Sequence, residues 1–258
     1  MENWRAALER FMEEWPYPYA LAGVLVCGSY ITGNPSERSD IDVHMVLKEG
    51  VEWRERGNRI IDGYLIEYFS NSPAQIRSYF EEDHQERSTH AAVQFATGEV
   101  LMDREGTISL LKQEALGWLK KPFEKTGETG LEFMKYGLWD TLDNLEDLYE
   151  KGAVEWEFVY HNSLNALFDE YCRFLSVEHI PYYQIGSYLN EDNYLKKYLK
   201  SPFPDDEFAR LFREALIAAD RRQKIWLFKK LYSRVLNQLG GFSIDGWKVK
   251  TPAGNSVT

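Results

Sequence analysis

The apolar and polar residues at the front of the chain follow two patterns, one typical of helices and one typical of strands. Apolar residues at helical spacing predict a first helix over residues 3–14. An almost unbroken apolar run over residues 19–27 predicts a buried strand, and the β-branched segment 41–47 predicts a second one. The front of the chain is therefore expected to combine helices with strands.

A hairpin and a helix start follow. The dipeptide Asp62-Gly63 separates the segments 59–61 and 64–69, and it readily supplies the positive φ angles of a type I′ turn. The two flanking strands are therefore expected to be antiparallel. Ser72-Pro73 predicts the start of a helix, because the hydroxyl can cap the first turn and proline is tolerated at its first position.

The periodicity becomes purely helical further along the chain. A helix is expected from about Arg87 to Thr97, followed by a short strand over 100–103. From Thr107 onward, apolar residues recur at helical spacing only. The segments concerned are 110–119, 131–148, 158–175 and 208–239. The pattern predicts an α/β (α+β) domain over residues 1–106 and a helical bundle over residues 107–258.

The composition is that of a globular protein. Of the 258 residues, 44% are hydrophobic and 28% are charged, which excludes collagen, coiled-coil and disordered classes. Cys27 and Cys172 lie far apart, so neither a disulfide framework nor a thiolate zinc site is expected. No segment approaches the ~20 apolar residues of a membrane span, and the N-terminus lacks the apolar core of a signal peptide. We therefore expect a cytoplasmic protein with no membrane partner.

The charge is unevenly distributed. The net charge of −11 disfavours nucleic acid as a partner. Residues 1–106 hold 10 basic and 19 acidic side chains, whereas residues 196–258 hold 13 and 6. This asymmetry is natural for one part that binds metal and another that binds phosphate. The basic residues of segment 210–234 fit two interpretations, a solvated helical face or a group that lines a cleft and binds phosphate.

The segment with the clearest chemistry holds two acids and a glycine turn. Residues two apart in a strand share a face, so Asp40 and Asp42 place two carboxylates side by side. Such anions repel unless a cation lies between them, and Mg²⁺ or Mn²⁺ suits oxygen ligands. Gly28-Ser29 turns directly off the first strand, where a phosphate can approach the backbone closely. A metal next to a phosphate cradle indicates phosphoryl chemistry.

A third acid lies in the next strand but one. Glu67 is flanked by apolar residues, and a buried carboxylate is costly unless it is paired or binds a metal. Three carboxylates from neighbouring strands meet the needs of a two-metal site. Arg38 and Ser39 lie beside the acid pair, where they fit contact with phosphate and equally a structural role in the loop.

These pieces together resemble a known superfamily. Gly28-Ser29, Asp40-x-Asp42 and a later apolar-flanked acid resemble the nucleotidyltransferase superfamily of DNA polymerase β, including its small bacterial and aminoglycoside-type members with a C-terminal helical domain. The resemblance covers roughly residues 15–110, and Glu67 stands where many relatives have Asp. It implies a nucleotidyltransferase domain with a mixed twisted sheet, followed by a helical domain that binds or closes over the substrate.

The resemblance also implies an activity. A nucleoside monophosphate, AMP from ATP, would be moved to a hydroxyl of a small-molecule acceptor such as an aminoglycoside-like compound, with Mg²⁺ or Mn²⁺ as the cofactor. Asp40, Asp42 and Glu67 would be the catalytic and metal-binding residues, and Gly28 and Ser29 would bind the nucleotide, joined by Arg38 and Ser39 as candidates. Two alternatives are a non-catalytic nucleotide-binding interaction module and a protein-adenylylating enzyme of the antitoxin type. The three acids favour an enzyme over the non-catalytic module.

Overall fold

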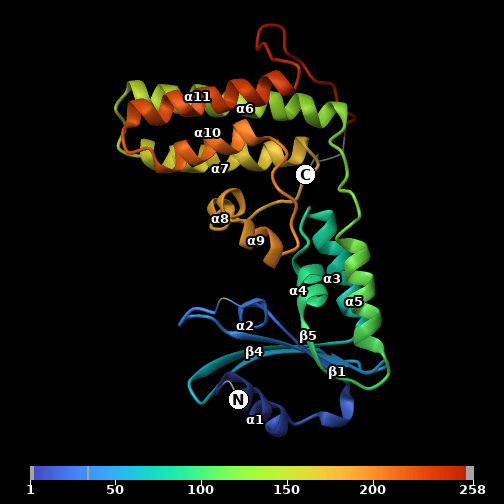
Figure 1. Cartoon of the computed structure of the whole chain (residues 1–258). Coiled ribbons are helices and arrows are strands. Elements are labelled where there is room, and N and C mark those ends of the chain that lie inside the picture. The colour runs from blue at the N-terminus through green and yellow to red at the C-terminus, as the bar shows by residue number, and fades with distance from the viewer. Residues whose placement is uncertain (1–2, 34, 254–258) are drawn as a thin grey trace. The chain divides into compact units, whose positions relative to one another are not determined.

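The computed structural model describes residues 3–33 and 35–253. The chain folds into two compact units (Figure 1). The first comprises Met1–Pro122 with Lys196–Lys200, and the second comprises Phe123–Leu195 with Ser201–Thr258.

The first unit is built on a five-stranded sheet of order β3-β4-β2-β1-β5. Neighbouring strands are antiparallel except β2 and β4, which are parallel. The expected mixed sheet is therefore confirmed. The strands are β1 (Leu21–Cys27), β2 (Ile41–Leu47), β3 (Glu55–Ile61), β4 (Tyr64–Asn71) and β5 (Glu99–Asp103).

Helices cover both faces of this sheet (Figure 1). Alternate residues of β1 point to opposite faces of the sheet. Val24 joins the core between the sheet and α1 (Asn3–Glu14), and Leu25 joins the core on the other face. That second core is closed by three helices, which are α3 (Pro73–Gln85), α4 (His90–Thr97) and α5 (Thr107–Trp118). A 3₁₀ turn over Pro18–Ala20 delays the start of β1 relative to the predicted residue 19.

Two local predictions are confirmed in the same unit. Ile61 pairs with Tyr64 across a two-residue turn, and its residues Asp62 and Gly63 have φ angles of 51° and 84°, as a type I′ turn requires. The Ser72 hydroxyl accepts a hydrogen bond from the backbone N–H of Gln75 at 3.3 Å, capping α3.

Helix α5 packs with the first unit, not with the helical one. Its residues Ile108, Leu111 and Ala115 are fully buried in the core above β1. The compact unit therefore extends to Pro122, whereas the sequence pattern placed the domain boundary after residue 106. Helical periodicity shows that a helix forms, but it does not show which core its apolar face joins.

The second unit is helical, as predicted, and the segment 208–239 forms two helices. The chain is interrupted at Ala218–Asp220, where the Asp220 carboxylate accepts a hydrogen bond from the Gln223 N–H at 2.9 Å and starts a new helix. Two short helices were not predicted, α8 (Ile185–Asn190) and α9 (Asp192–Lys197). The longer helices are α6 (Glu128–Glu150), α7 (Trp156–Phe174), α10 (Asp206–Ile217) and α11 (Arg221–Gln238).

No helix among the described residues combines the length and the apolar composition needed to cross a bilayer.

Candidate functional site

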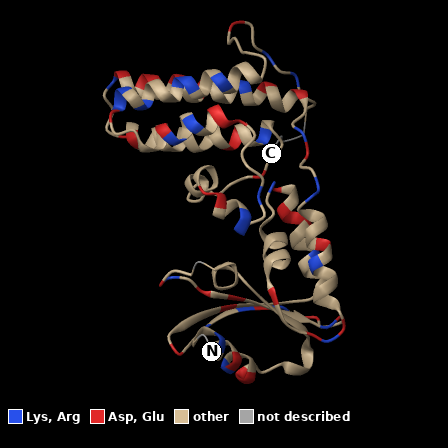
Figure 2. Ribbon diagram, viewed as in Figure 1, with Lys and Arg blue, Asp and Glu red and all other residues tan. Residues whose placement is uncertain are grey.

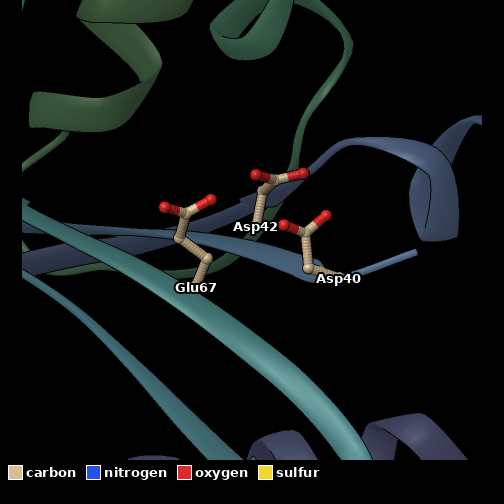
Figure 3. Close-up of side chains that lie close together, drawn as sticks. All are labelled: Asp40, Asp42 and Glu67. Carbon is tan, nitrogen blue, oxygen red and sulfur yellow. The ribbon is translucent and has the colours of Figure 1, made fainter. Parts of the chain in front are cut away.

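The parallel pair β2 and β4 brings the three predicted acids together. Asp42 of β2 lies opposite Glu67 of β4 in the strand register, and Asp40 immediately precedes β2. One carboxylate oxygen from each residue lies within 4.8 Å of those of the other two. The three side chains project on the same side of the strands, and their carboxylates lie close together (Figure 3). Asp42 is also the one residue of β2 that is not fully buried, so the strand opens to solvent at this position.

The predicted glycine turn lies directly against the acid pair. Gly28 follows Cys27, which pairs with Asp42 in the strand register, and it has a φ angle of 76°. A Cβ atom at Gly28 would lie 2.1 Å from Oδ2 of Asp42. Glycine is therefore required both by the backbone conformation and by the close approach of the carboxylate.

The turn continues into a single helical turn, α2 (Ser29–Thr32). The Gly28 carbonyl accepts hydrogen bonds from the backbone N–H of Thr32 at 3.1 Å and from its hydroxyl at 3.0 Å. The Ser29 carbonyl accepts a hydrogen bond from the Gly33 N–H at 3.0 Å. These bonds fix the path of the backbone beside Asp42. Nucleotide binding by Gly28 and Ser29 stays a prediction.

The electrostatics of the cluster favour a bound cation. Burial raises the pKa of Asp42 to about 7, and the neighbouring charges of Asp40 and Glu67 add to the effect, while Arg56 opposes it. At neutral pH the cluster therefore holds on to a proton unless a positive charge replaces it. A divalent ion supplies that charge.

The donor set fits a hard metal ion. Three carboxylates offer oxygen ligands only, which suits Mg²⁺ or Mn²⁺. Burial also raises the pKa of the nearby Cys27 thiol well above its usual value, with Asp42 and Asp40 contributing to the rise. In the metal-free cluster the thiol is therefore protonated.

Arg56 is a site residue that the sequence analysis missed. It lies on the edge strand β3, and its Nε and Nη2 atoms donate to Oε1 of Glu67 at 2.9 and 2.6 Å. Its guanidinium also lies 4.8 Å from the ring centroid of Phe69. The hairpin register carried the signal, because a two-residue turn at Asp62-Gly63 places Arg56 opposite Phe69, on the same face as Glu67.

The comparisons with known proteins find likeness among solved structures, but not among protein families or curated proteins. No model of a protein family matches the chain, and no curated protein matches it. Among solved structures, the crystal structure of a nucleotidyltransferase-like protein from Exiguobacterium sibiricum 255-15 is similar over 91% of this chain and 73% of its own. The two chains share 11% sequence identity, and the TM-score is 0.43. The likeness is a distant one.

Arg38 and Ser39, the other two candidates, lie in the loop before β2. The Ser39 hydroxyl accepts a hydrogen bond from the backbone N–H of Ser36 at 2.8 Å, and the Ser36 hydroxyl accepts one from the Arg38 N–H at 3.2 Å. Contact of Ser39 with phosphate stays a prediction. The Arg38 side chain is exposed, and its contact with phosphate stays a prediction.

His44 follows Asp42 on the same strand face but belongs to the core. Its Nε2 atom lies 3.2 Å from Oε1 of Gln94, and its ring packs against Phe69 and Phe95. Burial lowers the pKa of His44 to about 4, and the hydrogen bond to Gln94 offsets only part of this effect. His44 is therefore neutral at physiological pH and acts as a packing residue.

The basic residues of segment 210–234 are engaged within the helical unit, and their spread along α10 and α11 is visible in Figure 2. Most of them form ion pairs, which favours the interpretation as a helical surface over that of a phosphate-binding group. These pairs are Arg210 with Glu207 and Glu214, Arg221 and Lys224 with Glu157, Lys229 with Glu146, and Arg234 with Asp205.

An open hollow of about 570 Å³ lies between α3 and α5. None of the basic residues of segment 210–234 lines it. Its lining includes Arg77, Glu81, Glu114 and Trp118, and none of the three clustered acids. The Arg77 guanidinium is already occupied by a two-point ion pair with Glu114 at 2.8 and 3.0 Å.

Proposed function

We propose that this chain is a metal-dependent nucleotidyltransferase that moves a nucleoside monophosphate, AMP from ATP, to a hydroxyl of a small-molecule acceptor. The observation that carries the proposal is the meeting of three carboxylates from β2 and β4 with oxygens within 4.8 Å of one another. A second feature supports it, since the glycine turn after β1 reaches the Asp42 carboxylate with no room for a side chain.

The roles follow from the positions. Asp40 and Asp42 would hold both metal ions, and Glu67 would hold the one nearer the acceptor. When bound, Mg²⁺ or Mn²⁺ lowers the pKa of the attacking hydroxyl and neutralises charge on the triphosphate and the leaving pyrophosphate. The backbone of Gly28 and Ser29 would orient the β- and γ-phosphates.

The bonds and the proton of this transfer are all accounted for. The acceptor oxygen forms a bond to the α-phosphorus, and the bond from that phosphorus to the bridging oxygen of pyrophosphate breaks. Glu67 takes the hydroxyl proton.

The test is a mass measurement. The protein is incubated with each nucleoside triphosphate, with Mg²⁺ or Mn²⁺, and with a panel of aminoglycosides, lincosamides and a cell extract. We expect one acceptor to gain the mass of a nucleoside monophosphate, and the gain to disappear in the Asp40→Asn/Asp42→Asn variant. Asp62→Asn is the matched control, because Asp62 lies in the hairpin turn and pairs with Arg10 outside the cluster.

The same experiment separates the alternatives. A mass gain on a protein in the extract would indicate adenylylation of a protein partner. Nucleotide binding with no pyrophosphate release would indicate the non-catalytic module. Full transfer by the Asp40→Asn/Asp42→Asn variant would refute the proposed site.

A further inference from the structure

Among the described residues, Arg56 is the cation that directly contacts the acid cluster. Both of its hydrogen bonds go to the same oxygen, Oε1 of Glu67. The Arg56 side chain is 70% exposed, whereas that of Glu67 is 17% exposed. The guanidinium is therefore held by one carboxylate oxygen, lies over the Phe69 ring and is otherwise exposed to solvent.

We propose that Arg56 is the counter-ion of the metal-free cluster, and that it leaves Glu67 when a divalent ion binds and then contacts the polyphosphate of the nucleotide. This inference rests on the proposed function, because it assigns a role within the same site. It identifies Arg56 as a nucleotide-binding residue whose availability depends on the metal.

The present contact is one that a metal ion can displace. Both nitrogens share one oxygen, so the pair lacks the two parallel bonds of the strongest arginine–carboxylate geometry. Ion pairs with an exposed partner contribute little net free energy in water. A divalent ion at Glu67 offers the carboxylate twice the charge and repels the guanidinium at the same time.

The released side chain has a natural ligand nearby. The planar guanidinium carries five N–H donors in a fork that matches phosphate oxygens. Arg56 lies on the face of the sheet where Asp42 and Glu67 meet, so a triphosphate held by ions at those carboxylates brings its negative charge close to the guanidinium. Arg56 would thus contact the Glu67 carboxylate before the metal and the nucleotide bind, and the phosphates of the nucleotide afterwards.

The chain provides a matched control on the same strand. Arg59 is three residues from Arg56, so the two side chains leave β3 on opposite faces. Its Nη2 atom donates to Oε2 of Glu14 at 2.8 Å, beneath the sheet. Arg59→Gln therefore removes the same charge from the same strand without touching the cluster.

The experiment measures the affinity for Mn²⁺ and the affinity for the nucleotide separately. Mn²⁺ binding to the full chain is followed by electron paramagnetic resonance of the free ion. Nucleotide binding is followed by calorimetry at saturating Mn²⁺, with the α,β-methylene analogue of ATP, which cannot be cleaved at that position. The variants are Arg56→Gln, Arg56→Lys and Arg59→Gln.

The two affinities are expected to move in opposite directions. Without the competing charge, Arg56→Gln should bind Mn²⁺ about tenfold more tightly, a size set by the screened repulsion between the two cations. It should bind the nucleotide analogue about tenfold more weakly, as expected for the loss of a charged phosphate contact. Arg56→Lys should lie between Arg56→Gln and the wild type for both affinities, and Arg59→Gln should match the wild type.

Two results would overturn the inference. One is an Arg56→Gln variant with unchanged affinities, and the other is a variant in which both affinities fall together, as a structural role would produce. The proposed function fails in a different way: Asp42→Asn would then bind Mn²⁺ as tightly as the wild type does.

Discussion

The acid cluster of the first unit and the buried Asp205 of the second have opposite surroundings. In the first, Asp40, Asp42 and Glu67 are held together by the strand register, and the one guanidinium seen at the cluster contacts Glu67 alone. In the second, the buried Asp205 accepts hydrogen bonds from the Tyr171 hydroxyl at 2.6 Å and from Arg234. Asp205 also caps α10 by accepting a hydrogen bond from a backbone N–H.

The consequences for ionisation differ in sign. Burial and neighbouring negative charges raise the pKa of Asp42 to about 7. Burial acts in the same direction on Asp205, but the hydrogen bonds from Arg234 and Tyr171 outweigh it and lower the pKa of that carboxyl. A paired carboxylate thus stabilises the fold, whereas a cluster of like charges costs stability until a cation binds. Asp205 is thus satisfied within the fold, whereas the three-acid cluster carries negative charge that a cation can balance.

The largest expected effect is on transfer activity at Glu67. Glu67→Gln removes a negatively charged metal ligand and the proton acceptor, so the rate of pyrophosphate release should fall by about a thousandfold or more. Glu67→Asp keeps the carboxylate and should retain a measurable part of the activity. Equal rates for Glu67→Gln and the wild type would remove Glu67 from the site.

The next largest effect is on stability in the helical unit. Asp205→Ala removes the helix cap and leaves Arg234 and Tyr171 without their partner, which should lower the free energy of unfolding by about 3 kcal/mol. Lys229→Ala breaks an exposed pair with Glu146 and should cost less than about 0.5 kcal/mol. Urea denaturation measures both variants. Similar losses would show that the two pairs do not differ as the comparison requires.

A pH dependence of stability should appear in the metal-free chain. The pKa of Asp42 rises from 3.8 to about 7 on folding, so the folded state binds more protons than the unfolded state between these values. The stability that this group contributes should therefore be greatest at and below about pH 4 and fall toward pH 7, by on the order of 2 kcal/mol.

The variant Asp42→Asn isolates this contribution, because its side chain does not titrate. Its stability should decline less than that of the wild type over the same pH range. Saturating Mn²⁺ at pH 8 should restore stability to the wild type and not to Asp42→Asn. Parallel pH profiles of the two proteins would contradict the like-charge description of the cluster.

The smallest expected effect is that of alanine at two glycines with positive φ angles. Gly28 and Gly33 have φ angles of 76° and 95°, so alanine at either position should cost about 1 kcal/mol of stability. A Cβ at Gly33 meets no atom within 4 Å, whereas one at Gly28 lies 2.1 Å from the Asp42 carboxylate. Only Gly28→Ala should weaken Mn²⁺ binding, by about tenfold. Equal Mn²⁺ affinities would show that the turn does not shape the cluster.

Features carried by local sequence could be predicted well. The bounds of β2, the Asp62-Gly63 turn and the Ser72 cap depend on neighbouring residues only, and the structure confirms all three. The cluster of acids was also accessible, because a period of two places Asp40 and Asp42 on one side of the strand. Glu67 drew attention as a carboxylate among apolar residues.

Features set by tertiary contacts were missed. Arg56 lies in the polar half of an edge strand, where no apolar pattern marks the strand, and its meaning depends on Glu67 across the hairpin. The break before α11 is instead a local feature, the Asp220 cap, and the helical periodicity on both sides of it conceals the break in the sequence. Helix α5 has the same periodicity as its successors, and only its contacts assign it to the first unit.

The most direct test of the central claim is anomalous diffraction at the manganese edge, from crystals of the full chain grown with Mn²⁺ and the α,β-methylene analogue of ATP. We expect anomalous density between the carboxylates of Asp40, Asp42 and Glu67, with the guanidinium of Arg56 turned from Glu67 toward the phosphates. A loaded nucleotide with no anomalous density at these carboxylates, and Arg56 still on Glu67, would contradict the account.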